Sequence, residues 1–411
     1  MEHDTAPRRL QPVGERMVHL DVLRGFALLG ILLVNFQWFT RPVKTLVMGS
    51  EPGLQGLDLV VDLLIMTLAE GKFYALFSML FGAGFALMMG RAAQRQVRFW
   101  GIYLRRLLVL MLFGLAHMLL IWSGDILFIY SLCGFFMVLL FRNTPLNRLW
   151  KWSIVFWSIP ALLSLVLAGL ILLAGVDAEL EREILGGFEA ELTGVTAAIE
   201  RAEIINREGS WADNVGQRAR DASFLLGSAI FWVSPVLGFF LLGRWLVQSD
   251  RLANPDQHRL FFRRWRARGL LFGLPLAVLA TALLHGQNLI MPTFPMAFGS
   301  LLMMISSIFL SLAWLSMVTL GANRLAWLAP AGRMALTNYL LQSLAWTWLF
   351  YGHGAGLWGL FPRWSHLLLA LGFFGLQLVI SHWWMKRFRF GPAEWLWRSL
   401  SYFQLQPMRR A

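Results

Sequence analysis

The stretch LDVLRGFALLGILLVNF, residues 20–36, decides the fold. Asp21 and Arg24 lie one helical turn apart at its start, and Asn35 lies near its far end. As a helix, the stretch would separate Arg24 from Asn35 by roughly 16 Å, about half the thickness of a bilayer core. A charged pair in such a run is costly unless it faces protein or water. The stretch therefore predicts a membrane span that also carries candidate functional groups.

The composition of the whole chain supports a membrane protein. Of the 411 residues, 57% are hydrophobic and only 14% are charged, whereas about 25% are charged in an average soluble domain. The apolar runs are long and continuous, and a β-barrel would instead show alternating segments of about ten residues. We therefore expect an all-α, polytopic bundle of transmembrane helices.

Apolar runs near 20 residues, punctuated by Gly, Pro and charges, predict about ten spans. Arginine and lysine gather in alternate connections, which predicts cytoplasmic positions for both termini. Residues 57–69 are either a short re-entrant or interfacial helix or the start of a long second span. The predicted spans are 18–39, 72–90, 102–122, 125–141, 152–174, 224–247, 270–284, 297–320, 334–350 and 366–385.

The same pattern divides the chain into five parts. A cytoplasmic segment, 1–17, precedes an N-terminal membrane half, 18–174. An acidic, helix-prone loop, 175–221, is expected outside the membrane, followed by a second membrane half, 222–385. The last part, 386–411, is basic and aromatic, and such a tail favours the membrane interface.

The formal net charge of +13 fits orientation by the positive-inside rule rather than binding of nucleic acid, which needs basic residues clustered on a soluble module. We therefore expect membrane lipids as partners and no nucleic acid. The single cysteine, Cys133, excludes an internal disulfide and a cysteine metal cluster. The chain shows no metal-ligand spacing, so no metal is expected.

The two ends of the first span allow two interpretations. Asp21 and Arg24 are either an i, i+3 pair that holds its inner end or a binding site in which Arg24 holds a phosphate or carboxylate. Asn35 is then either an interhelical hydrogen-bonding group or a site residue. Glu70 and Lys72, at the start of EGKFYALFSMLFGAGF, are a boundary pair or substrate-binding groups.

The stretch HMLLIWSGDILFIY, residues 117–130, places His117 deep in one predicted span and Asp125 at the start of the next. An Asp at a helix start is a common cap, but an imidazole in lipid needs a polar partner. A histidine can act as a general base that a carboxylate orients. The spacing of eight residues across a turn allows contact between the two without requiring it.

A polar stripe marks AGRMALTNYLLQS, residues 331–343. Arg333, Thr337, Asn338 and Gln342 recur at helical spacing in an otherwise apolar run. Such a stripe in a membrane span is expected to face a polar interior, which makes it a candidate cavity lining.

Several of these blocks, together with FGLAHMLLIWSGDILFIYSLCG and FGPAEWLWR, resemble the YeiB-like family of bacterial inner-membrane proteins, whose C-terminal half is domain of unknown function 418. The first half is similar to heparan-α-glucosaminide N-acetyltransferase and, more loosely, to acyltransferase family 3. That resemblance implies a multi-pass protein of the bacterial inner membrane and acyl transfer from cytoplasmic acyl-CoA. It also implies a catalytic role for Asn35. The stretch after Asn35, FQWFTRPVKTL, has no histidine, so the expected base is His117.

The leading hypothesis is a transmembrane acyltransferase that moves an acyl group from acyl-CoA to an extracytoplasmic glycan or lipid acceptor. His117 would be the base, Asp125 would orient it, and Asn35 would stabilise the oxyanion. A basic inner vestibule of Arg24, Arg105, Arg106 and Arg333 would hold the CoA phosphates. The alternatives are a proton-coupled transporter or exporter of a small solute or lipid and a scaffold subunit without turnover. A homodimer is left open.

Overall fold

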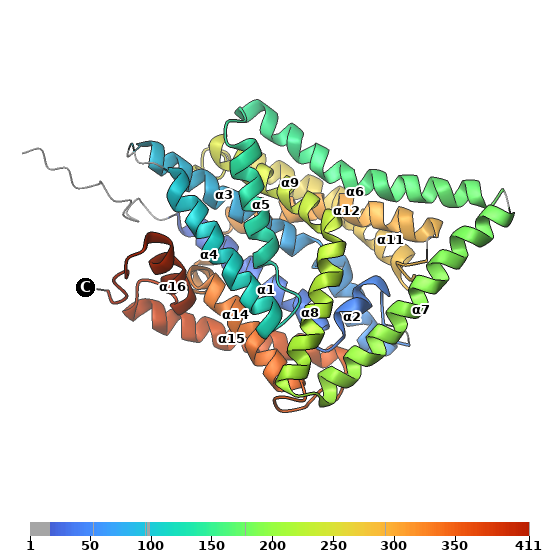
Figure 1. The fold of residues 1–411 in the computed structure, drawn as a ribbon. Helices are drawn as coiled ribbons and strands as arrows, with labels where there is room; N and C mark the ends of the chain where they lie inside the picture. The colour runs from blue at the N-terminus through green and yellow to red at the C-terminus, as the bar shows by residue number, and fades with distance from the viewer. Residues whose placement is uncertain are drawn as a thin grey trace, which may run out of the picture.

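The computed structural model describes residues 17–51, 53–94, 96, 99–176, 178–291 and 293–410. Helices dominate it (Figure 1), and within these residues the only strand-like pairing is an isolated bridge between Phe388 and Arg409. The prediction of an all-α membrane bundle is confirmed. In chain order the helices are α1 Val18–Phe39, η1 Val43–Val47, α2 Gly56–Leu68, α3 Lys72–Gln94, α4 Phe99–Leu120, α5 Leu127–Phe141, α6 Leu146–Ala174, α7 Ala178–Glu208, α8 Trp211–Gly227, α9 Ala229–Gln248, α10 Arg259–Arg268, η2 Gly269–Gly273, α11 Leu274–Leu284, α12 Phe294–Leu320, η3 Ala326–Leu328, α13 Ala329–Arg333, α14 Ala335–Phe350, α15 Arg363–Arg387 and α16 Pro392–Tyr402.

Eight helical segments of the described chain are long and apolar enough to cross a membrane. The predicted count of ten included two helices that are shorter than the roughly 20 residues a span needs. These are α5, with 15 residues, and α14, with 16 residues. The predicted runs for these two helices, 125–141 and 334–350, were already shorter than that length, and this explains the difference. The eight segments are Val18–Phe39, Gly56–Gln94, Phe99–Leu120, Leu146–Leu173, Phe231–Gln248, Arg259–Leu284, Phe294–Leu320 and Arg363–Arg387.

Residues 57–69 form a helix of their own, α2, which a short turn joins to α3. Gly71 in this turn has φ +79°, a conformation that glycine adopts without strain, and a Cβ there would overlap Ser307 Oγ. The helix packs against α11 and α15, whereas α3 packs against α9 and α1. The turn therefore sends the two halves of one apolar run to different neighbours.

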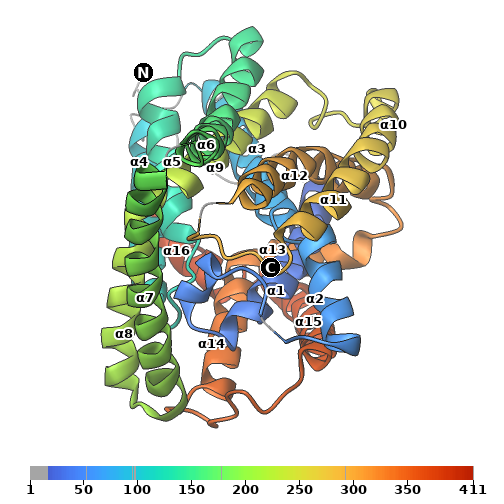
Figure 2. The same ribbon diagram turned by 90° about the vertical axis from the view of Figure 1, so that its right-hand side faces the viewer.

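Helix α1 lies near the centre of the bundle in two perpendicular views (Figures 1 and 2). It contacts α3, α12, α13, α14 and α15, and Leu23, Leu28 and Leu32 are completely buried. Small residues allow the close approach. A Cβ on Gly25 would overlap the carbonyl oxygen of Leu328, and small residues at helix contacts are typical of membrane bundles. Residues 20–36 are thus the core of the fold.

Helices α3 and α9 cross at two reciprocal glycines. A Cβ on Gly82 would overlap the backbone of Phe240, and a Cβ on Gly243 would overlap the backbone of Met79. Each helix therefore brings its own glycine against the main chain of the other. The contact is as close as two helical backbones allow.

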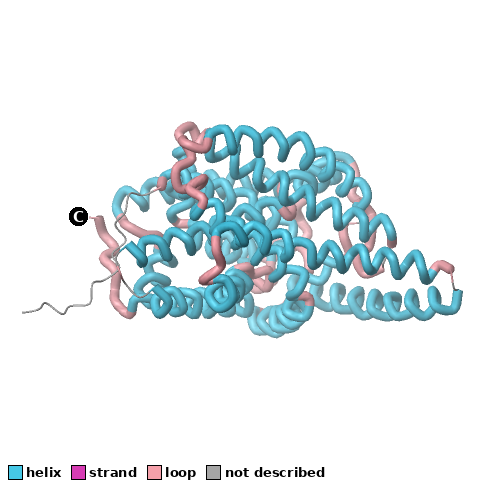
Figure 3. Tube along the Cα trace, turned by 90° about the horizontal axis from the view of Figure 1, so that it is seen from above, coloured by secondary structure: helices cyan, strands magenta, loops and turns pink. Residues whose placement is uncertain are grey.

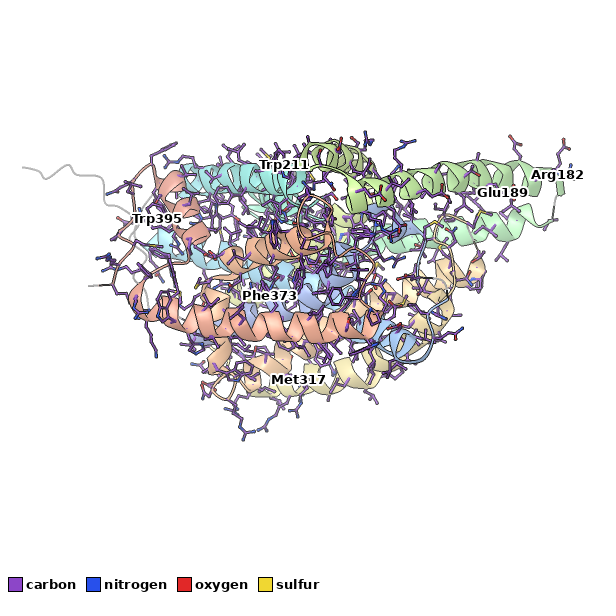
Figure 4. All side chains as sticks on the ribbon, turned by 90° about the horizontal axis from the view of Figure 1, so that it is seen from below. Arg182, Glu189, Trp211, Met317, Phe373 and Trp395 are labelled. Atoms are coloured by element: carbon purple, nitrogen blue, oxygen red, sulfur yellow. The ribbon has the colours of Figure 1, made fainter. Side chains whose placement is uncertain are left out.

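Helices α6 and α7 extend beyond the rest of the molecule (Figure 3). Figure 4 places Arg182 and Glu189 at this projecting end and Trp395 at the opposite end. The far half of α6 exposes Leu165, Val166 and Leu172. Helix α7 returns to the bundle, where Asn206 accepts a hydrogen bond from Gly352 N at 2.8 Å. The acidic segment expected at 175–221 is thus built of α7 and most of α8.

The C-terminal tail folds back on the bundle. Helix α16 packs against α4 and α14. The chain after it pairs with the end of α15, where Arg389 N donates to Met408 O at 2.8 Å and Arg410 N donates to Arg387 O at 3.1 Å. Glu394 of α16 accepts hydrogen bonds at the start of α14 from Leu336 N at 2.7 Å and from the Thr337 hydroxyl at 2.6 Å. The tail therefore caps a membrane helix distant in sequence.

The buried carboxyl group of Glu394 makes the stability of the folded protein depend on pH. Burial raises the pKa of its carboxyl above the ordinary 4.5, against the opposing effect of the Thr337 hydrogen bond. Because the folded protein then holds this proton more tightly than the unfolded chain, the associated stabilisation is complete below about pH 4.5 and is lost as pH rises through the folded-state pKa. We expect wild-type protein to lose thermal stability relative to Glu394→Gln between pH 4 and pH 8. Thermal unfolding of both proteins in detergent measures this, and a difference that grows in favour of wild type with pH would contradict it.

Candidate functional site

The centre of the candidate site is a buried pair between His117, near the end of α4, and Asp125, in the turn before α5. His117 Nδ1 lies 2.8 Å from Asp125 Oδ2, with 1% and 0% of the side-chain surfaces exposed. The contact that the spacing allowed is therefore made. The Asp125 carboxylate can only accept a hydrogen bond, so in a neutral imidazole the proton is on Nδ1. The other ring nitrogen, Nε2, then carries the lone pair.

Local sequence explains how Asp125 reaches the histidine. Trp122 N donates to His117 O at 2.8 Å, which ends α4. The second oxygen of Asp125 accepts from Phe128 N at 2.7 Å and so caps α5. Gly114, one turn before His117, leaves the space, because a Cβ there would lie 2.8 Å from Asp125 Oδ1. The carboxylate is thus fixed from both helices.

Aromatic rings enclose the imidazole. The ring centroid of Tyr339 lies 5.2 Å away and that of Trp122 lies 6.4 Å away. His117 Nε2 and Trp122 Nε1 are both buried, and neither has a hydrogen-bond partner within the described part of the chain. A buried polar atom without a partner is costly. The imidazole Nε2 can therefore accept, and the neighbouring indole Nε1 can donate, one further hydrogen bond.

Helix α8 holds the turn from the other side. Arg218 Nη1 donates to Leu120 O at 2.9 Å, and Ser123 Oγ donates to Asp221 Oδ2 at 3.3 Å. Gln217 donates to the other oxygen of Asp221 at 2.9 Å. Burial raises the pKa of Asp221, while the hydrogen bonds from Gln217 and Ser123 act in the opposite direction. Helix α8 is therefore fastened to the turn that carries Asp125.

Helix α1 carries candidate residues at both of its ends. Arg24 Nη1 contacts Asp21 Oδ1 at 3.0 Å, with 31% and 5% of the side chains exposed, so the predicted i, i+3 pair is present. Asn35 is half-buried. Phe39, one helical turn beyond Asn35, packs against Trp122 at 4.4 Å between ring centroids. The far end of α1 thus contacts the ring of Trp122, which also lies beside the His117 imidazole.

The other basic candidates have partners of their own. Lys72 is completely buried, and its ammonium donates to Met66 O at 3.1 Å rather than to Glu70, which is half-buried. Arg105 lies over the Phe403 ring at 4.9 Å, and Arg106 lies over the Trp397 ring at 4.0 Å. The structure therefore places both arginines beneath the C-terminal tail.

The polar stripe of α14 meets polar groups of α15. Asn338 Nδ2 donates to the Ser381 hydroxyl at 3.0 Å, and Gln342 Nε2 donates to Gln377 Oε1 at 2.8 Å. Gln377 in turn donates to Asn338 O at 2.9 Å. Asn338 and Gln342 are thus brought together by Gln377. Arg333 lies half-buried at the end of α13.

A second polar site was not predicted. A cavity of about 10 Å³, large enough for about one water molecule, is lined by Gln37, Asp62, Arg363 and His366 together with apolar residues. Asp62 and His366 are each only 5% exposed. The sequence did hold a signal, because an ionisable residue in an apolar helix is a functional candidate by default. Neither residue is among the candidate site residues predicted from the sequence.

Among the residues the structure describes, no three His, Cys, Asp or Glu side chains come together as ligands. The candidates therefore comprise a His–Asp pair near the end of α4, an acid–base pair on α1, a polar contact between α14 and α15, and the small polar cavity.

This fold and site define a polytopic α-helical membrane protein with a buried His–Asp pair. The family model described as "Protein of unknown function (DUF418)" matches residues 246–404. The uncharacterized protein YxaH of Bacillus subtilis (strain 168) is 33% identical over 98% of both chains. The uncharacterized protein YeiB of Escherichia coli (strain K12) is 31% identical over 94% of this chain and 96% of its own. The chain belongs to the YeiB-like, DUF418-containing family. No solved structure matches it significantly.

Proposed function

We propose that this membrane protein is an acyl-CoA-dependent transmembrane acyltransferase with His117 as its general base. The observation that carries the proposal is the imidazole itself: Nδ1 is bonded to Asp125 at 2.8 Å, and Nε2 is buried without a partner in the described structure. A carboxylate that fixes the tautomer leaves the other nitrogen ready to accept a proton. The similarity of the first span to transmembrane acyltransferases gives the same expectation.

The proposed reaction needs two proton transfers and one displacement. Nε2 of His117 takes the proton from an acceptor hydroxyl or amine, whose oxygen or nitrogen attacks the thioester carbonyl carbon. The C–S bond of the tetrahedral intermediate then breaks, and the imidazolium returns its proton to the CoA thiolate. The products are the acylated acceptor and CoA thiol. Asp125 stabilises the imidazolium, and donors such as Asn35 Nδ2 and Trp122 Nε1 are assigned to the oxyanion.

The donor is assigned to the cytoplasmic side and the acceptor, a glycan or lipid, to the outer side of the bacterial inner membrane. Arg24 and Arg333, both half-buried, are assigned to the proposed vestibule for the CoA phosphates. Arg105 and Arg106 would join them only if α16 moved off α4. Glu70, Lys72, Asn338 and Gln342 are assigned to the walls of the pathway.

The small polar cavity favours a second candidate function, a proton-coupled transporter or exporter. Buried ionisable groups such as Asp62 and His366 are found in the proton relays of pumps and transporters. In this alternative the two residues exchange protons as a small solute or lipid crosses the membrane. His117 and Asp125 would form a second relay station.

Proteoliposomes distinguish the two functions. Labelled acyl-CoA is supplied on the side where the termini are exposed, and the lumen contains an extract of bacterial glycans and lipids. Mass spectrometry then identifies any acylated product. Transfer of label with release of CoA thiol supports the acyltransferase. Counterflow of an unmodified solute without CoA release supports the transporter and would reject the acyltransferase.

A further inference from the structure

A pocket of about 380 Å³ opens beside α10, at one end of the membrane-spanning segment Arg259–Leu284. Figure 2 shows α10 at an edge of the bundle, away from α4 and α5. Three guanidinium groups, an imidazole and two aromatic rings line the pocket. They belong to Arg251, Arg264, Arg268, His258, Phe261 and Trp265.

One of the cations is held in place. The guanidinium of Arg251 lies 4.5 Å from the Trp245 ring centroid and 5.0 Å from that of Phe261. The turn that carries it is anchored through its neighbour Leu252, which is completely buried and whose carbonyl oxygen accepts from His19 Nε2 at 2.8 Å. Such stacking leaves the edge of the guanidinium free to donate hydrogen bonds.

The acids of this turn are already engaged. Asp250 lies 3.5 Å from His258 Nε2 and accepts from Asn254 at 2.6 Å, and Asp256 lies 3.3 Å from Arg259. Within the described chain, no ion pair joins a carboxylate to any of the three pocket arginines. The pocket therefore keeps a surplus of positive charge, and several guanidinium groups around one space are suited to a phosphate.

The surroundings of the pocket are those of a membrane surface. Further along the same continuous helix, Leu271 and Phe272 are 67% and 52% exposed. Trp265, which lines the pocket, and Phe272 both pack against Phe309 of α12, with ring centroids 6.4 and 6.1 Å away. An apolar strip thus leads from the pocket along the outside of the bundle. Basic and aromatic residues at the end of an apolar span are typical of the headgroup level.

We propose that this pocket binds the phosphate of an anionic phospholipid, whose acyl chains lie along the strip formed by Trp265, Phe309 and Phe272. The phosphate accepts hydrogen bonds from Arg251, Arg264 and Arg268. The exposed Leu260 at the rim contacts the upper part of the chains. The site is separate from the His117 pair and does not depend on the proposed acyl transfer.

Native mass spectrometry of the purified full-length protein tests the site, with phosphatidylglycerol and phosphatidylcholine titrated in turn. We expect Arg264→Gln/Arg268→Gln to weaken phosphatidylglycerol binding about ten-fold. Phosphatidylcholine binding should change less, because the choline cation opposes the positive charge of the pocket. The matched control is Arg263→Gln/Arg266→Gln. It removes the same charge from exposed arginines of the same helix that do not line the pocket, and it should change binding less than two-fold.

Three results would overturn the proposal. Equal losses in the two double variants would indicate diffuse attraction to a basic helix, and no loss in either would exclude phosphate binding by the pocket. The third result concerns a soluble source of phosphate. If adenosine 3′,5′-bisphosphate binds with the same dependence on Arg264 and Arg268 while phosphatidylglycerol does not, the pocket belongs to a nucleotide. Thermal unfolding of all variants, whose substituted side chains are exposed, checks that they remain folded.

Discussion

Replacing His117 with Ala is expected to lower the rate of acyl transfer by about 10²–10⁴-fold, the usual contribution of a positioned general base. In the proposed reaction Nε2 of this imidazole accepts the acceptor's proton, so its loss removes the first step. The measurement is the rate of acylated product formation in proteoliposomes. A matched control is His382→Ala, since His382 lies exposed on α15 and only contacts Leu378 O within its own helix.

Because His117→Ala leaves the Asp125 carboxylate buried without its partner, a second variant separates chemistry from folding. Asp125→Asn keeps the volume but offers an amide to Nδ1, which favours the wrong tautomer of the imidazole. We expect it to remain folded and to lose activity to a similar extent. If either variant, purified as a monodisperse protein, kept more than about a tenth of wild-type turnover, His117 would not be the base.

The second large effect concerns stability. Gly82→Val is expected to destabilise the folded protein by about 3 kcal/mol or more. The new side chain would overlap the backbone of Phe240, which cannot yield as a side chain can. Separating α3 from α9 would open the contacts of Phe85 and Phe240, two of the most deeply buried rings. Gly243→Val, which overlaps Met79 from the other helix, should behave alike.

Thermal unfolding in detergent measures this loss, together with the yield of monodisperse protein. The control is Gly90→Val on the same helix, where nothing lies within 4 Å of an added Cβ. Its midpoint should differ little from wild type. A Gly82→Val protein as stable as this control would show that α3 and α9 do not pack so closely.

Periodicity and apolar length were sufficient to predict most of the membrane helices. The long runs of α1, α12 and α15 each appear as one uninterrupted helix, because a span must satisfy its backbone hydrogen bonds internally. Contacts between residues that are distant in the sequence produce no pattern in the sequence that would predict them. The ring of Trp397 covers Arg106 from 291 positions away, and nothing in the spacing of either residue indicates the other.

The partners of the polar side chains were equally difficult to predict from the sequence. A stripe such as Asn338 and Gln342 predicts a polar neighbour, but a wet cavity and a second polar helix satisfy it equally. The structure supplies the helix, through Gln377 and Ser381. His117 and Asp125 were identifiable because they are close in sequence. Asp62 and His366 line one cavity from helices about 300 residues apart, and only the fold brings them together.

The hydrogen bonds that join α8 to Leu120 and Ser123 also couple this helix to the His117–Asp125 pair. Arg218, Trp211 and Asp221 all bond to the few residues between His117 and Asp125. A molecule that binds α7 and α8 and shifts them would therefore also change the orientation of the imidazole. An antibody fragment raised against α7 and α8 is expected to change the rate of the proposed acyl transfer.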